Sequence, residues 1–305
     1  MSGVAGSRGG RALHPEDAVA SLRSMNRSKT TEGAVSRQID AAGHRTNLLE
    51  AGNGTPVVLL HGSGPGVSAW ANWNGVLDAF AERHHVIAPD IAGFGHTELK
   101  PDGDYDIKVW VGHLIGVLDA LGIERAALVG NSFGGGIALA AALRHPERVE
   151  RLVLMGTPAG EFTMTPGLRA GWEYEPSEDA MRSLLRLFPH DERWVTDEMV
   201  AERYAASARP GAQAAFRRLI PAPEPEGETI VRGVPERALR TIAQPTLVLH
   251  GREDHVVPFE LGVRLHRCIP DSELHGFGQC GHWVQVERRE RFLDLTLEFL
   301  ARGAA

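Results

Sequence analysis

Short apolar runs rich in Val, Leu and Ala alternate along this chain with longer segments in which apolar residues recur every three or four positions. The short runs are typical of buried strands, and the longer segments are typical of amphipathic helices. Their alternation predicts an α/β fold with a mostly parallel sheet flanked by helices. The expected strands are 34–40, 45–51, 57–61, 86–89, 126–129, 152–155, 246–250 and 273–277, and the expected helices are 70–83, 107–121, 135–144, 260–268 and 283–301.

One connection interrupts this rhythm. No strand pattern is present between residues 156 and 244, and a structureless loop of that length is improbable in a compact domain. Ser177 and Thr196 each precede an amphipathic segment, as N-cap residues do. We therefore expect residues 157–243 to form a helical lid inserted into a core made of residues 35–156 and 244–305.

Residues 1–34 differ from the rest of the chain. Their first part is rich in Gly, Ser and Arg and lacks the apolar segment of a secretory signal. A short helix over 15–22 within a mostly flexible arm is the expected structure. An organelle transit peptide is the alternative, and Glu16, Asp17 and Glu32 argue against it.

Composition narrows the function classes. With 305 residues, 43% of them hydrophobic, the chain can bury one large core and a small subdomain. The net charge of −7 argues against a nucleic-acid partner. No apolar run is long enough to predict a membrane span. The two cysteines, Cys268 and Cys280, are expected to be reduced thiols of a cytoplasmic protein, and a disulfide between them is the alternative.

A G-x-S-x-G box at Gly130–Gly134 is the strongest chemical signal. It follows the apolar run 126–129 and precedes a strong helix former, which is the strand–turn–helix context of a nucleophile elbow. This turn strains the backbone of Ser132, so its neighbours must be small, as Gly130 and Gly134 are. Ser132 is therefore the predicted nucleophile, and the N–H of Phe133 is a predicted oxyanion donor.

A serine nucleophile needs a base, and the base needs an acid that orients it. In the chain order Ser, Asp, His, Asp254 follows the expected strand 246–250 and His282 follows the expected strand 273–277. Both therefore fall in loops after core strands. Glu253 is the rival acid, and a solvent-exposed loop carboxylate is the alternative interpretation of Asp254.

The second oxyanion donor is expected from the Gly-rich loop after strand 57–61. Its sequence is Gly62-Ser63-Gly64-Pro65-Gly66, and it lacks both a dinucleotide fingerprint and a P-loop Lys-Ser/Thr. The backbone N–H of Ser63 is the predicted donor. Its hydroxyl either faces the site or belongs to a solvent-facing turn. No spacing of His, Cys and Asp predicts a metal site.

Four stretches together resemble the meta-cleavage-product hydrolases, α/β-hydrolases that break carbon–carbon bonds in aromatic degradation. The stretches are 61–66 with Trp70-Ala71-Asn72, then 130–136, 251–254 and 277–283. The resemblance covers about residues 35–302 and implies the α/β-hydrolase fold with an eight-stranded sheet. It implies a 2-hydroxy-6-oxohexa-2,4-dienoate substrate, no cofactor, and a homodimer or larger homo-oligomer.

The same resemblance implies roles for further residues. Arg203 would meet the substrate carboxylate, and its alternative is a lid-surface ion pair with Glu198 or Glu202. The residues expected to surround the dienoate are Ser63, Asn72, Asn131, Arg203 and Trp283. The walls expected around the C6 substituent are Phe133, Pro158, Trp172 and Val257.

The resulting hypothesis is hydrolysis of the C5–C6 bond by a serine triad, with either an acyl-enzyme or direct attack by water. Within the family, the lid sequence most resembles enzymes for 2-hydroxymuconic semialdehyde or 6-alkyl analogues, ahead of enzymes for 6-aryl or other bulky substrates. Two other classes remain as alternatives: a carboxylesterase with the same triad, and a hydrolase-fold ligand receptor.

Overall fold

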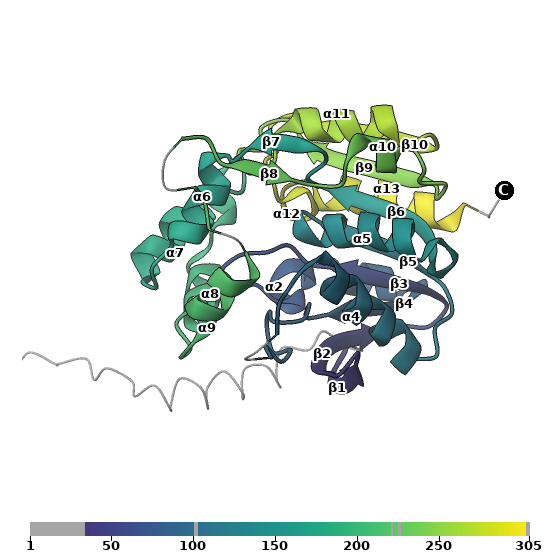
Figure 1. Cartoon of the computed structure of the whole chain (residues 1–305), viewed down its shortest axis with the longest axis horizontal. Coiled ribbons are helices and arrows are strands. Elements are labelled where there is room, and N and C mark those ends of the chain that lie inside the picture. The colour runs from purple at the N-terminus through teal and green to yellow at the C-terminus, as the bar shows by residue number, and fades with distance from the viewer. Residues whose placement is uncertain (1–33, 101–102, 221, 225–226, 303–305) are drawn as a thin grey trace, which may run out of the picture.

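An eight-stranded sheet forms the centre of the molecule (Figure 1). The computed structural model describes residues 34–100, 103–220, 222–224 and 227–302, so the expected N-terminal arm and its helix 15–22 lie, except for Ala34, outside the described residues. The sheet has the order β1-β2-β4-β3-β5-β6-β9-β10. Its strands are β1 (Val35–Ala41), β2 (His44–Ala51), β3 (Thr55–Leu60), β4 (His84–Pro89), β5 (Ala126–Asn131), β6 (Val149–Met155), β9 (Thr246–Gly251) and β10 (Ser272–Phe277).

All eight expected strands are therefore confirmed. The pairings β1–β2 and β2–β4 are antiparallel, and the remaining five pairings are parallel. The central strands are buried on both faces, which is why they are continuous apolar runs in the sequence. Along β3, for example, Val58 and Leu60 face one core cluster while Val57 and Leu59 face the other.

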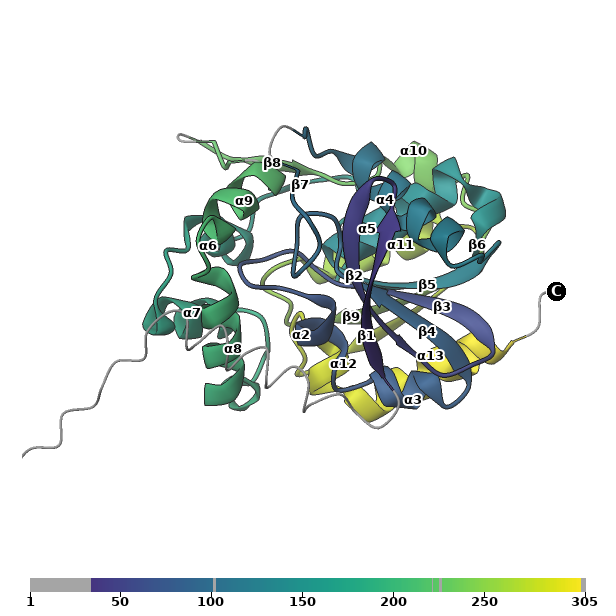
Figure 2. The same ribbon diagram turned by 90° about the horizontal axis from the view of Figure 1, so that it is seen from below.

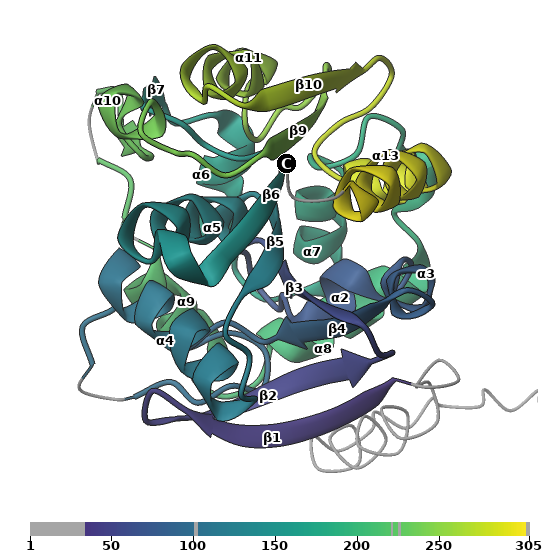
Figure 3. The same ribbon diagram turned by 90° about the vertical axis from the view of Figure 1, so that its right-hand side faces the viewer.

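Helices cover both faces of the sheet (Figure 3). One face is covered by α4 (Ile107–Ala120), α5 (Phe133–Arg144), α10 (Glu236–Leu239) and α11 (Phe259–Cys268). The other face is covered by α2 (Ala69–Trp73), α3 (Leu77–Ala81), α12 (Val284–Glu287) and α13 (Arg289–Ala301). The loops at the ends of the parallel strands thus lie outside both helical layers, where ligand sites of open α/β sheets form.

Two expected helices are each divided into two. The segment 70–83 breaks between α2 and α3, where exposed Gly75 is followed by Val76 with φ −130°. The segment 283–301 breaks at Arg288, whose φ −128° and ψ 36° are not helical. Apolar periodicity continues across both breaks, so the pattern alone did not reveal them.

The connection from β6 to β9 is mainly helical, as expected. It contains α6 (Pro166–Glu173), α7 (Glu178–Leu185), the 3₁₀ turn η2 (Glu192–Trp194), α8 (Asp197–Ser207) and α9 (Ala212–Leu219), and it ends with α10. Ser177 and Thr196 are confirmed as N-caps, because their side chains accept hydrogen bonds from Ala180 N and Met199 N. Figures 1 and 2 show α6–α9 gathered beyond one end of the sheet.

The expectation that this connection holds no strand was wrong. β7 (Glu161–Thr163) and β8 (Ile230–Arg232) form an antiparallel ribbon. Each strand has three residues, of which the outer two are exposed, so neither is long enough to show an alternating pattern. Hereafter residues 157–243 are called the insertion.

Candidate active site

The backbone at Ser132 forms the sharp turn that the sequence predicts. Ser132 joins the end of β5 to the start of α5 with φ 52° and ψ −113°, a strained conformation for a residue with a side chain. Its N–H donates a 2.7 Å hydrogen bond to the Met155 carbonyl at the end of β6. The turn is thereby fixed to the neighbouring parallel strand.

Close backbone contacts explain the glycines on either side. A Cβ atom on Gly130 would lie 2.6 Å from backbone atoms of Gly135, and one on Gly134 would lie 2.3 Å from the Leu60 carbonyl oxygen. Larger residues at these positions would push α5 away from β3 and β5. The requirement for small neighbours is confirmed.

Asp254 and His282 are in direct contact. Oδ2 of Asp254 lies 2.7 Å from Nδ1 of His282, and both side chains are buried. Oδ1 accepts hydrogen bonds from the N–H groups of Val256 (2.8 Å) and Val257 (2.9 Å), which fix the carboxylate. Burial would raise the pKa of Asp254, but the charge of His282 and hydrogen bonds from His250 and His282 hold that pKa well below its usual range. Asp254 is therefore ionised and oriented toward the imidazole.

The rival acid, Glu253, is directed elsewhere. Its carboxylate accepts a 2.8 Å hydrogen bond from Nε of Arg252 and a 3.2 Å hydrogen bond from the N–H of Cys280. Through Cys280 the Glu253 carboxylate holds the loop that carries His282, but it does not contact the imidazole ring. The geometry favours Asp254.

His250 is a member of this cluster that sequence reasoning did not assign. It is fully buried near the end of β9, with Nε2 3.4 Å from Oδ2 of Asp254 and 2.9 Å from the Val257 carbonyl oxygen. Because a carbonyl only accepts, Nε2 carries a hydrogen. The available signal was a histidine that ends the otherwise apolar run Leu247-Val248-Leu249.

A cavity of about 50 Å³ joins Ser132 and His282. The sheet loops form one side of it and the insertion forms the other. The sequence-predicted residues that line it are Ser63, Asn72, Asn131, Ser132, Arg203, His282 and Trp283. Residues from distant parts of the chain are thus brought together as the motifs predicted.

Three residues that line this cavity carry a buried N–H donor that lacks a partner among the described residues. The donors are Nδ2 of Asn72, Nδ2 of Asn131 and Nε of Arg203. A buried polar group without a partner is costly, so the cavity is suited to a ligand rich in hydrogen-bond acceptors.

Arg203 lies on α8 and is only 8% exposed. Burial lowers its pKa to about 10, with Tyr174 opposing the shift, and neither Glu198 nor Glu202 contributes to it. At neutral pH its guanidinium is therefore charged inside the protein. This burial argues against a lid-surface ion pair.

The Gly-rich loop is held rigidly beneath the insertion. Fully buried His61 donates from Nδ1 to the Gly62 carbonyl (2.7 Å) and accepts at Nε2 from the N–H of Ile91 (2.9 Å). A Cβ on Gly66, whose φ is +68°, would lie 2.3 Å from the Arg203 carbonyl oxygen. Helix α8 can therefore rest on the loop only because glycine is present there.

None of the four side chains predicted for the distal wall lines this cavity among the described residues. The ring of Phe133 packs edge-on against Trp110 in the core, although its N–H is still the first of α5. Trp172 turns away from the cavity, donates to the Ile220 carbonyl and lies under Arg217. Val257 is buried with Leu261, and the Pro158 backbone packs close to Gly233. The apolar wall is formed instead by Leu168, Phe188, Phe216, Ile220, Val256 and Val67.

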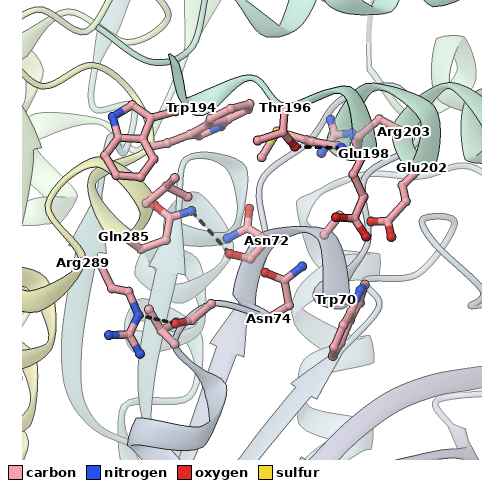
Figure 4. Close-up of a pocket in the computed structure, with 16 residues that line it drawn as sticks. Trp70, Asn72, Asn74, Trp194, Thr196, Glu198, Glu202, Arg203, Gln285 and Arg289 are labelled. Atoms are coloured by element: carbon pink, nitrogen blue, oxygen red, sulfur yellow. Dashed lines mark hydrogen bonds between the residues drawn. The ribbon is translucent and has the colours of Figure 1, made fainter. Parts of the chain in front are cut away.

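A second cavity of about 420 Å³ adjoins the first (Figure 4). It lies between the insertion, represented by Trp194 and α8, and the core helices α2 and α12. Asn72, Arg203 and Trp283 line both cavities, so these three side chains form a shared wall.

The described residues show neither a membrane-spanning helix nor a cluster of metal-binding side chains. None of their helices is long and apolar enough to cross a membrane. In the same ranges, no three His, Cys, Asp or Glu side chains are grouped so as to hold a metal ion.

Comparison with known proteins gives concordant results. Residues 55–289 match the family model of the alpha/beta hydrolase fold. The chain is 51% identical over 273 residues to a 2-hydroxymuconate semialdehyde hydrolase of Pseudomonas sp. (strain CF600), covering 89% of this chain and 95% of that protein. It is 48% identical over 268 residues to a 2-hydroxy-6-oxo-2,4-heptadienoate hydrolase of Pseudomonas putida (strain F1), covering 88% of this chain and 96% of that protein.

Solved structures agree with these relatives. The meta-cleavage product hydrolase CumD of Pseudomonas fluorescens IP01, crystallised with acetates, is 45% identical and superposes with a TM-score of 0.81, covering 87% of this chain and 97% of its own. A 2-hydroxy-6-oxo-6-phenylhexa-2,4-dienoate hydrolase from Rhodococcus sp. strain RHA1 is 28% identical with a TM-score of 0.78, covering 88% and 99%. The chain therefore belongs to the α/β-hydrolase fold family and, within it, to the meta-cleavage-product hydrolases.

Proposed function

We propose that this protein hydrolyses the C5–C6 bond of a 2-hydroxy-6-oxohexa-2,4-dienoate, giving 2-hydroxypenta-2,4-dienoate and a carboxylic acid. The carrying observation is that Asn72, Asn131 and Arg203, which line the cavity beside Ser132 and His282, each have a buried donor without a partner among the described residues. The acidic end of such a substrate has a carboxylate and an adjacent enol, which supply acceptors for these donors. A simple ester gives Arg203 nothing to bind.

His282 is the proposed base. Its Nδ1–H is held by Asp254, which leaves Nε2 to accept the proton of Ser132. The ionised Asp254 stabilises the imidazolium that forms. The bound dienol is first converted to its keto form with a proton added at C5, and Ser132 then adds to the C6 carbonyl.

The N–H groups of Phe133 and Ser63 are the proposed oxyanion donors. When the tetrahedral intermediate collapses, the C5–C6 bond breaks and its electron pair delocalises onto the C2 oxygen, which is then protonated. Water next releases the carboxylic acid from Ser132. In the alternative, His282 activates water directly. A pre-steady-state burst of 2-hydroxypenta-2,4-dienoate would favour the acyl-enzyme mechanism over direct attack by water.

A small C6 substituent is the proposed preference. Bulky apolar side chains, among them Leu168, Phe216 and Ile220, line the cavity beside Ser132 and restrict the space for a C6 substituent. The relatives named for semialdehyde and heptadienoate substrates are 51% and 48% identical, whereas the relative named for a 6-phenyl substrate is 28% identical. We therefore favour 2-hydroxymuconic semialdehyde or its 6-methyl analogue over 6-aryl substrates.

The proposal includes a cytoplasmic homodimer or larger homo-oligomer that uses no cofactor. The cytoplasmic assignment is supported by Cys268 and Cys280, which are buried free thiols.

The decisive assay follows loss of the near-visible absorbance of ring-fission products made from catechol, 3-methylcatechol and 2,3-dihydroxybiphenyl. We expect the first two to have the highest kcat/KM, and Ser132→Ala to abolish turnover of all three. p-Nitrophenyl acetate is the competing substrate. A much higher kcat/KM for that ester would replace the proposal with a carboxylesterase, and ligand binding without turnover would favour a receptor.

A further inference from the structure

Glu287 is a buried carboxylate outside the triad. It ends α12, is 6% exposed, and forms no ion pair with a Lys or Arg in the described part of the chain. Its two oxygens accept hydrogen bonds from two different segments. Oε2 accepts from the N–H of His190 in the insertion (2.7 Å), and Oε1 accepts from the N–H of Gly281 in the loop that carries His282 (2.9 Å).

The same two segments touch directly beside Glu287. The N–H of His282 donates a 2.7 Å hydrogen bond to the Phe188 carbonyl. The Phe188 ring stacks on Trp283, with centroids 5.3 Å apart and planes 17° apart, and its centroid lies 5.8 Å from that of His282. A Cβ on Gly281 would lie 2.3 Å from the Phe188 carbonyl oxygen, so this approach requires glycine. Residues 188–190 and 281–283 therefore form one continuous seam.

A carboxylate is the side chain that this seam requires. Burial raises the pKa of Glu287, while the N–H groups of His190, Gly281 and Trp283 act in the opposite direction. Glutamine has nearly the same shape but only one acceptor oxygen, so its NH₂ group would face one of the two backbone N–H groups. In either orientation of the amide, one of the two backbone N–H groups faces an NH₂ group in place of an acceptor.

We propose that Glu287 is a positioning residue: it fixes segment 188–190 of the insertion against the loop of His282 and so keeps the imidazole in register with Ser132. The inference rests on the proposed Ser132–His282 pair, but it does not depend on which substrate the enzyme takes. On this proposal the insertion does more than enclose the substrate. The packing of its segment 188–190 against the loop of His282 also orients the imidazole.

The test measures the reaction of Ser132 with diisopropyl fluorophosphate, which forms a phosphoserine ester with loss of fluoride and requires the histidine base. Mass spectrometry gives the rate constant of labelling and the final labelled fraction for wild type, Glu287→Gln and Glu290→Gln. Glu290 is the control, because it is an exposed glutamate three residues away on the adjoining α13.

For Glu287→Gln we expect complete labelling at a rate about 10- to 100-fold below wild type, since a displacement of about 1 Å has effects of this size. Glu290→Gln should match wild type. A merely structural role predicts a different result, namely a lower labelled fraction at the wild-type rate, because the protein that remains folded would be fully active. A lower labelled fraction at the wild-type rate for Glu287→Gln overturns the proposal. A wild-type rate together with a wild-type labelled fraction for this variant also overturns it.

Gly281→Ala tests the seam from its other side if Glu287→Gln does not fold. Its methyl group would lie 2.3 Å from the Phe188 carbonyl oxygen and 2.7 Å from the His190 nitrogen, so it would push the two segments apart without changing the Glu287 side chain. Slow but complete labelling is therefore again expected. A wild-type rate for this variant contradicts the proposal, as does a wild-type enzyme that is not labelled at all. If wild type is labelled but cleaves no ring-fission product, the proposed substrate is wrong and the labelling comparison still decides the role of Glu287.

Discussion

His250 lies beside the carboxylate that contacts His282, the proposed base, with its Nε2 atom 3.4 Å from Oδ2 of Asp254. The same nitrogen donates to the Val257 carbonyl at 2.9 Å, and Val257 N–H in turn donates to Oδ1 of Asp254. Asp254 is thus enclosed by His282 on one side and by a small network around His250 on the other. This network holds the loop that follows β9 against the end of β9.

The first prediction concerns His250→Leu. Leucine fills a similar volume but cannot donate, so the buried Val257 carbonyl loses its partner and Asp254 loses a neighbour that favours its ionised form. We expect the free energy of unfolding to fall by about 1–3 kcal/mol, the usual effect of leaving a buried acceptor unsatisfied. We expect kcat/KM to fall less than tenfold, because the contact between Asp254 and His282 remains. Urea denaturation and the absorbance assay measure the two effects, and unchanged stability would remove His250 from the network.

The second prediction separates the two neighbouring acids. Asp254→Asn presents an amide to His282 and favours the wrong tautomer, so kcat should fall roughly 10³- to 10⁴-fold with the fold intact. Glu253→Gln is the matched control, since its side chain contacts Arg252 and Cys280 and not the ring. We expect less than a fivefold effect on kcat for this variant. Equal losses in the two variants would refute the assignment of Asp254.

The third prediction concerns the stability of the protein at low pH. His113 on α4 is buried against Thr46, whose Oγ1 lies 2.8 Å from Nε2, and burial lowers the pKa of His113 to about 3. In the unfolded chain its pKa is about 6.5, so between these values the unfolded state binds the extra proton. Stability is therefore complete above about pH 6.5 and declines as the pH falls toward 3. From pH 7.0 to 5.5 this group alone should lower the free energy of unfolding by about 1 kcal/mol.

His113→Gln provides the comparison for that effect. Glutamine can still bond Thr46 but does not titrate, so its loss of stability over the same pH interval should be smaller by about 1 kcal/mol. Urea denaturation at the two pH values measures both proteins. Identical pH dependence would show that His113 is not the group responsible.

The sequence predicted the parts of this molecule whose signals are local. Buried parallel strands such as β5 are continuous apolar runs, and the turn at Ser132 needs glycines at fixed positions, so both were found. The contact between Asp254 and His282, the acid and base of the proposed triad, was expected because each residue lies in the loop that follows a strand. Each of these features depends on residues adjacent in the chain.

The parts that were missed depend on how the insertion packs. On α6, Leu168 lines the cavity while Trp172, four residues further along, turns toward α9, and only the positions of neighbouring helices decide which of the two faces inward. Glu287 and His250 carry no motif of their own, because their roles arise from backbone groups contributed by distant segments. Tertiary packing, which periodicity does not encode, fixed these contacts.

The fourth prediction is that Arg203 lowers the stability of the ligand-free protein but strengthens binding of the substrate carboxylate. Its guanidinium is buried, with Nε lacking a hydrogen-bond partner among the described residues, and it lines the cavity beside Asn72 and Asn131. Arg203→Met keeps the length of the side chain and removes an uncompensated buried charge. We therefore expect the free energy of unfolding of the ligand-free protein to rise by about 1–3 kcal/mol. Urea denaturation without ligand measures this gain.

The same variant should lose activity selectively. Without the cation, the carboxylate of the ring-fission product made from catechol is left unpaired inside the cavity, so kcat/KM should fall roughly 100-fold or more. A raised KM together with a lowered kcat would indicate that Arg203 also holds the dienoate for ketonisation. Turnover of p-nitrophenyl acetate, which has no carboxylate, should change less than threefold, and this ester is the internal control. A variant that is less stable than wild type and equally impaired toward both substrates would show that Arg203 supports the fold and does not bind the acidic end of the substrate.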